Sequence, residues 1–313
     1  MENFRIPIGD WIEAFVDFLG DVFGWLFDGI ATALGAVYEG LDWLLVTPPF
    51  WMIIAILAAL AFWVRGWKLA LGTALGMLVI VGVDQWTNAM DTLALVLVAS
   101  LIATAIGIPV GIAAARSDHV SRVARPALDF LQTMPAFVYL IPAIIFFGVG
   151  AVPGMIATIL FALAPGVRLT ELGIRGVDKE VVEAGHAFGA TPGRILRQIQ
   201  LPLAMPSIMA GINQIIMLSL SMVVIAGIVG AGGLGGEITR AIGRINVGLG
   251  FEAGISIVVI AMILDRITSA FADPDRARAR RAARTPSGER QQDTAGSTQG
   301  ESAAARPAPI ATA

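Results

Sequence analysis

Residues 130–167 read FLQTMPAFVYLIPAIIFFGVGAVPGMIATILFALAPGV and contain no Asp, Glu, Lys or Arg. A membrane-spanning helix needs about 20 mostly apolar residues, so this uncharged stretch is too long for one span. It is interrupted at residues 148–154 by GVGAVPG, in which glycine and proline favour a turn. The pattern therefore predicts two membrane spans joined by a short turn, and it indicates an all-α membrane protein.

The composition of the whole chain supports a membrane location. Of the 313 residues, 56% are hydrophobic and only 14% are charged, whereas a soluble domain carries about 25% charged residues. The chain has no cysteine, which excludes disulfides, thiolate metal sites and cysteine nucleophiles. Its two histidines, His119 and His186, are too few for a histidine-rich metal site. We therefore expect no metal site in this chain.

Further apolar stretches predict five more spans, near residues 50–64, 69–83, 92–115, 210–229 and 250–264. The first two are short and reach span length only if interfacial residues such as Trp67 and Trp86 are included. A re-entrant hairpin is the alternative for this pair, and it leaves the orientation of the later spans unchanged. The sequence thus predicts a polytopic transmembrane helical bundle of about seven spans.

The basic residues predict the orientation of this bundle. With the N-terminus outside, 18 of the 21 Lys and Arg residues fall in inward segments, and only Arg5, Arg240 and Arg244 fall outside. An excess of basic residues marks the cytoplasmic side of a membrane protein. We therefore expect a multi-pass protein of the bacterial plasma (inner) membrane, with its C-terminus in the cytoplasm.

The flanks of the chain differ from its centre. In residues 1–45, apolar residues recur at helical spacing among acidic ones, at Trp11, Phe15, Phe18, Val22 and Leu26. This predicts an outer amphipathic helix that either braces the spans or lies on the membrane without a specific role. Residues 46–88 hold the first two transmembrane segments, and 89–271 form the transmembrane core. Residues 272–313 predict a disordered basic cytoplasmic tail, suited to contact with membrane lipids rather than nucleic acid.

One predicted connection is long, from residue 168 to 205, and includes EAGHAFGATPGRILRQIQLP at 183–202. The pattern predicts a short helix from Asp178 to Ala187 that stops at Gly189, then a second helix with Thr191 as its N-cap and Pro192 at its first position. Leu201-Pro202 is expected to end that helix. The product is a cytoplasmic helix–turn–helix over residues 178–202, hereafter the knuckle, with side chains available to a partner.

This stretch resembles the EAA motif of the membrane subunits of ABC importers. The matched positions are Glu183, Ala184, Gly189, Ile199, Leu201 and Pro202, whereas Gly185 replaces the second alanine of the motif. Three further segments resemble permeases that import glycine betaine and proline betaine: 129–154, 200–214 and 220–235, beside the early IPIGDWIEAFVDFL at 6–19. The resemblance covers about residues 6–270 and implies a type I ABC importer permease.

The resemblance also implies partners. Two permease copies would pair with two cytoplasmic ABC ATPase subunits and receive substrate from an extracytoplasmic binding protein. The residues implied to couple with the ATPase are Glu183, Ala184, Gly185, Gly189, Ala190, Ile199, Leu201 and Pro202. The chain itself has only two lysines, Lys68 and Lys179, and neither stands in a P-loop. We therefore expect no catalysis and no cofactor in this chain, with ATP and Mg²⁺ used by the partner ATPase.

Polar residues inside the predicted spans are candidates for the substrate path, because such residues usually face the interior of a bundle. The candidates are Gln132, Thr133, Tyr139, Asn213, Gln214, Ser219 and Ser221. Hydrogen bonds between helices are the alternative role for many of them. An importer of another substrate (choline, an amino acid or a sulfonate) and an ion-coupled secondary carrier are the alternative functions.

GAGGLG at 230–235 matches the glycine pattern of dinucleotide-binding proteins, but that pattern has meaning only between a strand and a helix. After a predicted span it indicates a helix break or close helix packing instead. The acids Glu180 and Glu183 share a helix face in the knuckle, and His186 lies beside them. We interpret these three as surface residues of the knuckle rather than as catalytic groups.

Overall fold

The computed structural model describes residues 7–270, and every regular element in this range is helical. In chain order the elements are α1 (Ile8–Val46), α2 (Phe50–Arg65), α3 (Trp67–Gly82), α4 (Trp86–Arg116), α5 (Asp118–Thr133), α6 (Ala136–Phe147), α7 (Ala151–Arg175), α8 (Lys179–Ala187), α9 (Pro192–Ile195), the π-helical turn η1 (Leu196–Gln200), α10 (Leu201–Ile228), α11 (Gly233–Arg244) and α12 (Val247–Ser269). This confirms the all-α class. The predicted tail, 272–313, lies outside the described residues.

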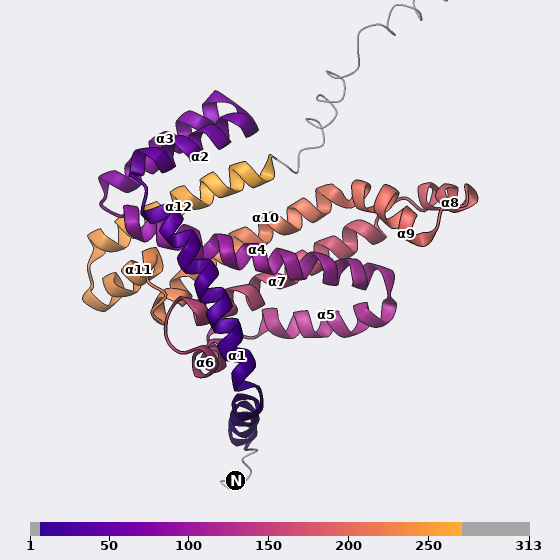
Figure 1. Ribbon diagram of the computed structural model, residues 1–313, viewed down its shortest axis with the longest axis horizontal. Coiled ribbons are helices and arrows are strands. Elements are labelled where there is room, and N and C mark those ends of the chain that lie inside the picture. The colour runs from indigo at the N-terminus through magenta and orange to yellow at the C-terminus, as the bar shows by residue number, and fades with distance from the viewer. Residues whose placement is uncertain (1–6, 271–313) are drawn as a thin grey trace, which may run out of the picture. The chain divides into compact units, whose positions relative to one another are not determined.

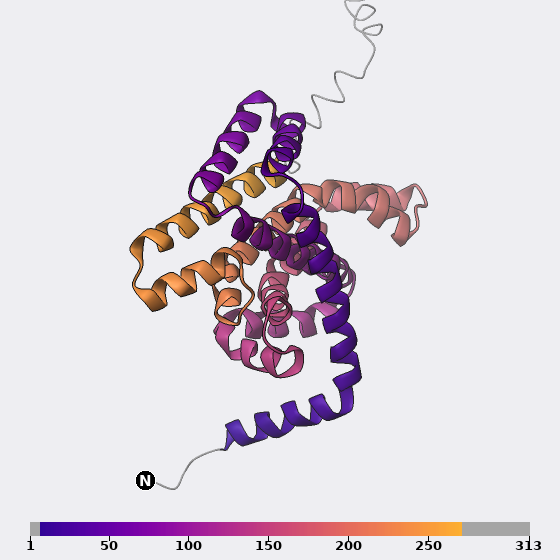
Figure 2. The ribbon, with the colours of Figure 1, turned by 60° about the vertical axis from the view of Figure 1, so that its left-hand side comes forward.

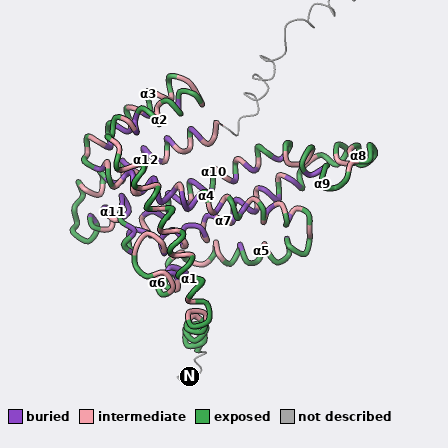
Figure 3. The backbone as a smooth tube through the Cα atoms, in the orientation of Figure 1, coloured by how far each residue is buried: buried purple, intermediate pink, exposed green. Residues whose placement is uncertain are grey.

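Helices α4, α7 and α10 form the centre of the bundle (Figures 1 and 3). Small residues allow α4 and α7 to approach closely. A Cβ atom added to Gly111 of α4 would lie 2.6 Å from the Cβ of Thr170 and 2.7 Å from the carbonyl oxygen of Val167. Without a hydrophobic force between helices in lipid, such close backbone packing is a main source of helix association. The small residues of these helices therefore position the centre of the fold.

The number of spans is lower than the seven expected from the sequence. Within residues 7–270, four helices are long and apolar enough to cross a membrane alone: α4, α7, the continuous helix Pro192–Ile228, and α12. Two bent pairs raise the count to at most six, α1 with α2 at 101° and α5 with α6 at 97°. Helix α3 has only 16 residues, and about 20 are needed to cross a bilayer.

The span predicted near residues 130–147 is broken close to its start. Helix α5 ends at Thr133, Pro135 precedes α6, and α6 has only 12 residues. Proline disfavours a helical conformation in the residue before it, so Met134 is extended, with φ −73° and ψ 131°. The uncharged run reads as one span because hydropathy does not register this break.

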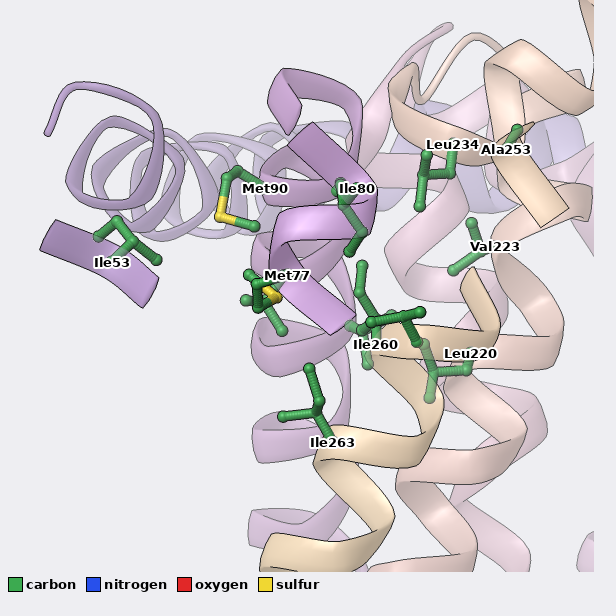
Figure 4. Packing of buried hydrophobic residues seen from close by; sticks show 14 of the residues in the cluster. Ile53, Met77, Ile80, Met90, Leu220, Val223, Leu234, Ala253, Ile260 and Ile263 are labelled. Atoms are coloured by element: carbon green, nitrogen blue, oxygen red, sulfur yellow. The ribbon is translucent and has the colours of Figure 1, made fainter. Parts of the chain in front are cut away.

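The short helices α2 and α3 form a hairpin that packs on the core. Figure 4 shows Ile53 of α2 and Met77 of α3 in the same cluster as Met90 of α4, Leu220 of α10 and Ile260 of α12. The ring of Phe50 meets Trp86 edge to face, with centroids 6.2 Å apart. The hairpin is thus part of the hydrophobic core of the bundle.

Residues 8–46 form one continuous helix, α1. The amphipathic spacing from Trp11 to Leu26 predicts the first part of this helix. Its second half packs on the core: Phe27 stacks on Phe146 of α6 at 4.3 Å, and Leu34 and Leu41 contact the cluster around Met155. Figure 2 shows the first turns of α1 bending away from this packed half. The aromatic side chains of that first part, such as Trp11, are exposed. A bracing role for α1 stays a prediction.

Candidate functional site

The first half of the knuckle is a capped helix with a glycine-dependent end. Asp178 caps α8 by accepting a hydrogen bond from the backbone N–H of Glu180 at 3.0 Å. At the other end, Gly189 has φ +77°, its N–H donates to the carbonyl of His186, and the N–H of Ala190 donates to the carbonyl of Gly185. These two bonds form a Schellman motif, which requires a left-handed residue at the position of Gly189. The predicted helix stop is confirmed.

The second half of the knuckle begins as expected and ends differently. Thr191 is the N-cap and Pro192 is the first helical residue of α9. The expectation that Leu201-Pro202 ends this helix is wrong, because the chain continues helically from Pro192 to Ile228. The π-turn η1 precedes the proline, and the N–H of Leu201 donates to the carbonyl of Leu196, five residues back. The wider π-turn changes the hydrogen-bond register just before Pro202, which has no N–H to donate.

The long connection is also shorter than expected. Helix α7 continues to Arg175, so residues 168–175 belong to a long helix rather than to a loop. Leu201 and Pro202 lie in the first turn of α10. Leu201 packs there against the cluster around Ile174. The connection between α7 and α10 therefore covers only residues 176–200. Leu201 and Pro202, which match the EAA motif, belong to α10 and not to this connection.

Gly185, which departs from the EAA pattern, lies at the contact between the two halves of the knuckle. A Cβ atom at this position would lie 2.8 Å from Cδ1 of Ile199 and 3.4 Å from Cγ1 of Ile195. Ile195 is buried. The glycine thus lets α8 pack closely on α9 and η1, and the structure brings Gly185 and Ile199 together. Glu183 and Ala184 are exposed on α8.

The tip of the knuckle carries an aromatic residue that the sequence analysis did not select. Phe188 is 93% exposed and directly precedes Gly189. This exposure leaves the ring available for contact with another molecule. The only signal in the sequence is an aromatic residue within a turn of small and polar residues. Figure 1 shows α8 and α9 projecting beyond the ends of α4 and α7.

A cleft of about 670 Å³ separates α8 from the ends of α4 and α7. Among its lining residues are Arg116 of α4, Arg175 of α7, and Glu183 and His186 of α8. His186 and Glu183 therefore face a cleft between elements and are not on a plain outer surface.

A charged network joins α5 and α7 at the same end of the bundle, which we call the knuckle end. The carboxylate of Glu171, with its side chain 5% exposed, accepts hydrogen bonds from Ser121 at 2.8 Å and Arg125 at 2.9 Å, and contacts Arg175 Nε at 3.1 Å. Three donors satisfy this buried charge, as burial in a low-dielectric site demands. The sequence alone does not single out Glu171, because its partners Ser121 and Arg125 lie about 50 residues away.

Arg175 extends the network to the turn between α4 and α5. It donates to the carbonyl of Ala114 at 2.8 Å and to Asp118 at 2.7 Å. The hydrogen bond and the charge of this guanidinium hold the pKa of the Asp118 carboxyl below its ordinary value. Asp118 stands outside the apolar spans, so the interaction is exposed to solvent and contributes little to stability. The geometric consequence is that α4, α5 and α7 are joined at the knuckle end.

The candidate path residues divide into inward-facing and outward-facing groups. The amide nitrogen of Asn213 donates to Asp265 at 3.1 Å, and its oxygen accepts from Thr268 at 2.6 Å, so it joins α10 to α12. Ser219 is buried and donates to its own helix. Tyr139 is buried, and its hydroxyl has no partner among residues 7–270. These three lie within the bundle rather than on one shared surface.

Other candidates lie on open faces. Gln214 and Ser221 are exposed on α10. Gln132 and Thr133 lie at the end of α5, where the hydroxyl of Thr133 donates to the carbonyl of Asp129 at 2.9 Å. The structure therefore does not assemble all seven candidates into one pocket. Gln214 and Ser221 are the two that share an uncovered helix face.

The glycine run 230–235 covers the break after α10 and the first turn of α11, and it lets the two helices pack backbone to backbone. A Cβ atom on Gly235 would lie 2.1 Å from the carbonyl oxygen of Val223, and one on Gly227 would lie 2.2 Å from the carbonyl carbon of Gly235. Thr92 of α4 accepts a hydrogen bond from the N–H of Leu234 at 2.8 Å. The run is therefore a helix break with close packing, as its place after a span predicts.

The chain belongs to the family of binding-protein-dependent transport system inner membrane components, whose model matches residues 107–273. It is therefore an inner-membrane component of an ABC transporter. The family match covers the knuckle and the helices that carry it.

Similar proteins agree with this family assignment. The chain is 48% identical to the glycine betaine/carnitine transport permease protein GbuB of Listeria monocytogenes, over 85% of this chain and 95% of that one. It is 44% identical to the glycine betaine/proline betaine transport system permease protein ProW of Escherichia coli, over 88% of this chain and 78% of that one. A structure of the MetNI methionine ABC transporter matches with a TM-score of 0.54 at 23% identity, over 59% of this chain and 94% of that one. This last likeness shows the fold alone.

Proposed function

We propose that this chain is the permease of an ATP-driven importer for glycine betaine, proline betaine or a related quaternary amine. The observation that carries the proposal is the knuckle, which ends in the exposed Phe188 and projects from the bundle. The printed substrates of GbuB and ProW support the substrate class. The chain holds no P-loop, so ATP hydrolysis with Mg²⁺ belongs to a separate ATPase.

The knuckle is the surface that docks on this ATPase. Closure of an ATPase dimer on ATP would push α8 and α9, and the continuous helix Pro192–Ile228 would carry that movement into the membrane. The excess of basic residues in inward segments supports an orientation with the knuckle in the cytoplasm and the N-terminus outside. Substrate then arrives from an extracytoplasmic binding protein at the opposite side.

The substrate path runs along one face of α10. Ala210, Gln214, Met217 and Ser221 are exposed and follow one another at spacings of four, three and four residues, so they form one stripe. Polar side chains at membrane depth are costly when they face lipid. An uncovered stripe with a glutamine and a serine is therefore expected to face a second permease copy across a water-filled path, with lipid around the assembled dimer.

Transport of a labelled substrate tests the proposal directly. We expect uptake of radiolabelled glycine betaine into vesicles that hold this chain, its cognate ATPase and its binding protein, and no uptake when the ATPase or ATP is left out. Unlabelled proline betaine should compete, whereas methionine should not. Uptake by the permease alone, driven by an ion gradient, would instead show an ion-coupled carrier. Competition by methionine or a sulfonate, but not by betaines, would show a different substrate class.

The absence of cysteine makes the path stripe testable by labelling without background. We expect Gln214→Cys and Ser221→Cys to react with a charged, water-soluble thiol reagent about tenfold faster or more than Leu101→Cys, because thiolate reactivity requires water. Leu101 is a suitable control, since it is 68% exposed on α4 within a span. Saturating glycine betaine should slow the reaction at the stripe. Equal, slow reaction at all three positions would assign the stripe to lipid.

A further inference from the structure

Three arginines surround a second hollow at the knuckle end. This hollow has a volume of about 530 Å³ and is lined by Arg116 of α4 and by Arg194 and Arg197 of the second half of the knuckle. The rest of its lining consists of uncharged residues: Thr191, Gly193, Leu196 and Gln198. Within residues 7–270, none of the three arginines forms an ion pair. The hollow thus concentrates positive charge with no carboxylate to neutralise it.

The other arginines at the knuckle end differ in their pairing, and Arg122 contacts His119 and the carbonyl of Asp118 without an ion pair among the described residues. Three others at the knuckle end each have a carboxylate partner: Arg125 with Glu171, Arg168 with Asp129, and Arg175 with Asp118. Like charges gathered in a concave site repel one another and attract an anion. The unpaired set therefore points to an anionic ligand that comes from outside this chain.

The second half of the knuckle has two distinct faces. Ile195 and Leu196 are buried against the rest of the protein, whereas Arg194 and Arg197 are exposed at a spacing of three residues. Residues three apart lie on the same face of a helix. Because the buried face holds the helix in place, the two guanidinium groups are presented outward together, beside Arg116 at the end of α4.

The length of the helix places these arginines beyond the lipid. The continuous helix Pro192–Ile228 has 37 residues, and a hydrocarbon layer of about 30 Å takes about 20. Counted back from Ile228, about 17 residues, or about 25 Å at 1.5 Å each, extend past the hydrocarbon. The headgroup layer adds only about 5–8 Å on each side. Arg194 and Arg197 therefore stand in water, where a protein partner reaches them more readily than a lipid headgroup.

We infer that the Arg116–Arg194–Arg197 hollow is an electrostatic docking site for an acidic surface of the ATPase. This inference rests on the proposed function and adds a second, charge-dependent contact to the apolar contact of Phe188. Phe188 directly follows α8, and Arg194 lies in α9, so the two contacts lie on either side of the turn that joins these helices. Phe188 supplies apolar area that is buried in the complex. The arginines align the permease with the ATPase and speed their association in a salt-dependent way.

Charge reversal tests the inference in the assembled complex. We expect the R116E/R194E/R197E variant of the full permease, in nanodiscs, to bind its cognate ATPase about 10- to 100-fold more weakly than wild type. Wild-type affinity should fall as KCl is raised from about 0.05 M to about 0.5 M, and the variant should lose most of this dependence. Arg122→Glu is the matched control, because Arg122 is exposed on α5 and lies outside the hollow. It should keep wild-type affinity and salt dependence.

A second variant separates this inference from the proposed function. Phe188→Ala should weaken ATPase binding without changing its salt dependence. If Phe188→Ala weakens binding and the triple reversal does not, docking stands and the electrostatic site is refuted. If neither variant weakens binding, the knuckle is not the docking surface. If the triple reversal has an effect only in nanodiscs that contain anionic phospholipid, the hollow binds headgroups and the inference is overturned. Unchanged thermal unfolding of each variant shows that the fold is intact.

Discussion

The substitution Gly235→Ala is expected to unfold the junction between α10 and α11. The added Cβ would lie 2.1 Å from the carbonyl oxygen of Val223 and 2.8 Å from the carbonyl carbon of the same residue. Both are backbone atoms of α10, so neither can move aside as a flexible side chain would. Overpacking of this kind costs about 3 kcal/mol or more, and we expect a fall of about 10 °C in the midpoint of thermal unfolding.

The same helix provides the matched control. Gly236 is the next residue of α11, and a Cβ at that position meets no atom within 4 Å. Gly236→Ala should therefore keep or slightly raise the midpoint, because alanine favours a helix over glycine by about 1 kcal/mol. Thermal unfolding of both variants in the same detergent compares them. Equal midpoints would contradict the close approach of α10 and α11.

The substitution Gly189→Val is expected to abolish transport while leaving the protein in the membrane. Gly189 has φ +77°, and a Cβ there meets no atom within 4 Å, so the obstacle is the backbone conformation and not space. A left-handed conformation costs an L-residue about 1–2 kcal/mol, and a β-branched residue adopts it least readily. The Schellman bonds from Gly189 and Ala190 would break, and Phe188 would no longer be aimed at the ATPase. We expect a loss of tenfold or more in glycine betaine uptake.

Asparagine distinguishes a conformational requirement from a steric one at this position. Asn is the non-glycine residue that most readily takes the left-handed conformation at a helix end. Gly189→Asn should therefore keep most of the uptake, although its side chain is about as large as that of valine. Uptake rates and the amount of permease in the membrane are measured together. If Gly189→Val transports at the wild-type rate, or if Gly189→Asn fails equally, the role of the helix cap is refuted.

Local patterns predicted much of the site correctly. Gly189 as a helix stop and Thr191-Pro192 as a helix start are both confirmed, because each is decided by the chemistry of a few adjacent residues. Asp178, expected as the first residue of the short helix, is instead its N-cap. The end of the second helix was wrong, because a π-turn before Pro202 lets the chain continue into α10. Such a change of hydrogen-bond register depends on the packing of the whole helix.

The errors in the span count have a similar origin. Hydropathy marks residues 130–147 as one apolar stretch, but the extended Met134 before Pro135 bends the chain by 97°. Helix α3 is apolar and still only 16 residues long. Apolar composition measures the free energy of burial in lipid, and it does not report the direction of the chain or the length of each helix.

The sequence by itself determined that this is an all-α membrane protein with a helix–turn–helix knuckle that carries an EAA-like motif. Those features rest on composition and on short patterns, which act through neighbouring residues. Only the tertiary structure decided that Phe188 is bare at the tip, that Glu171 is neutralised by α5, and that Arg116, Arg194 and Arg197 are left without partners. Pairing and exposure depend on which distant helices meet. The pairing of a charged side chain and the exposure of an aromatic ring therefore cannot be predicted from a short stretch of sequence.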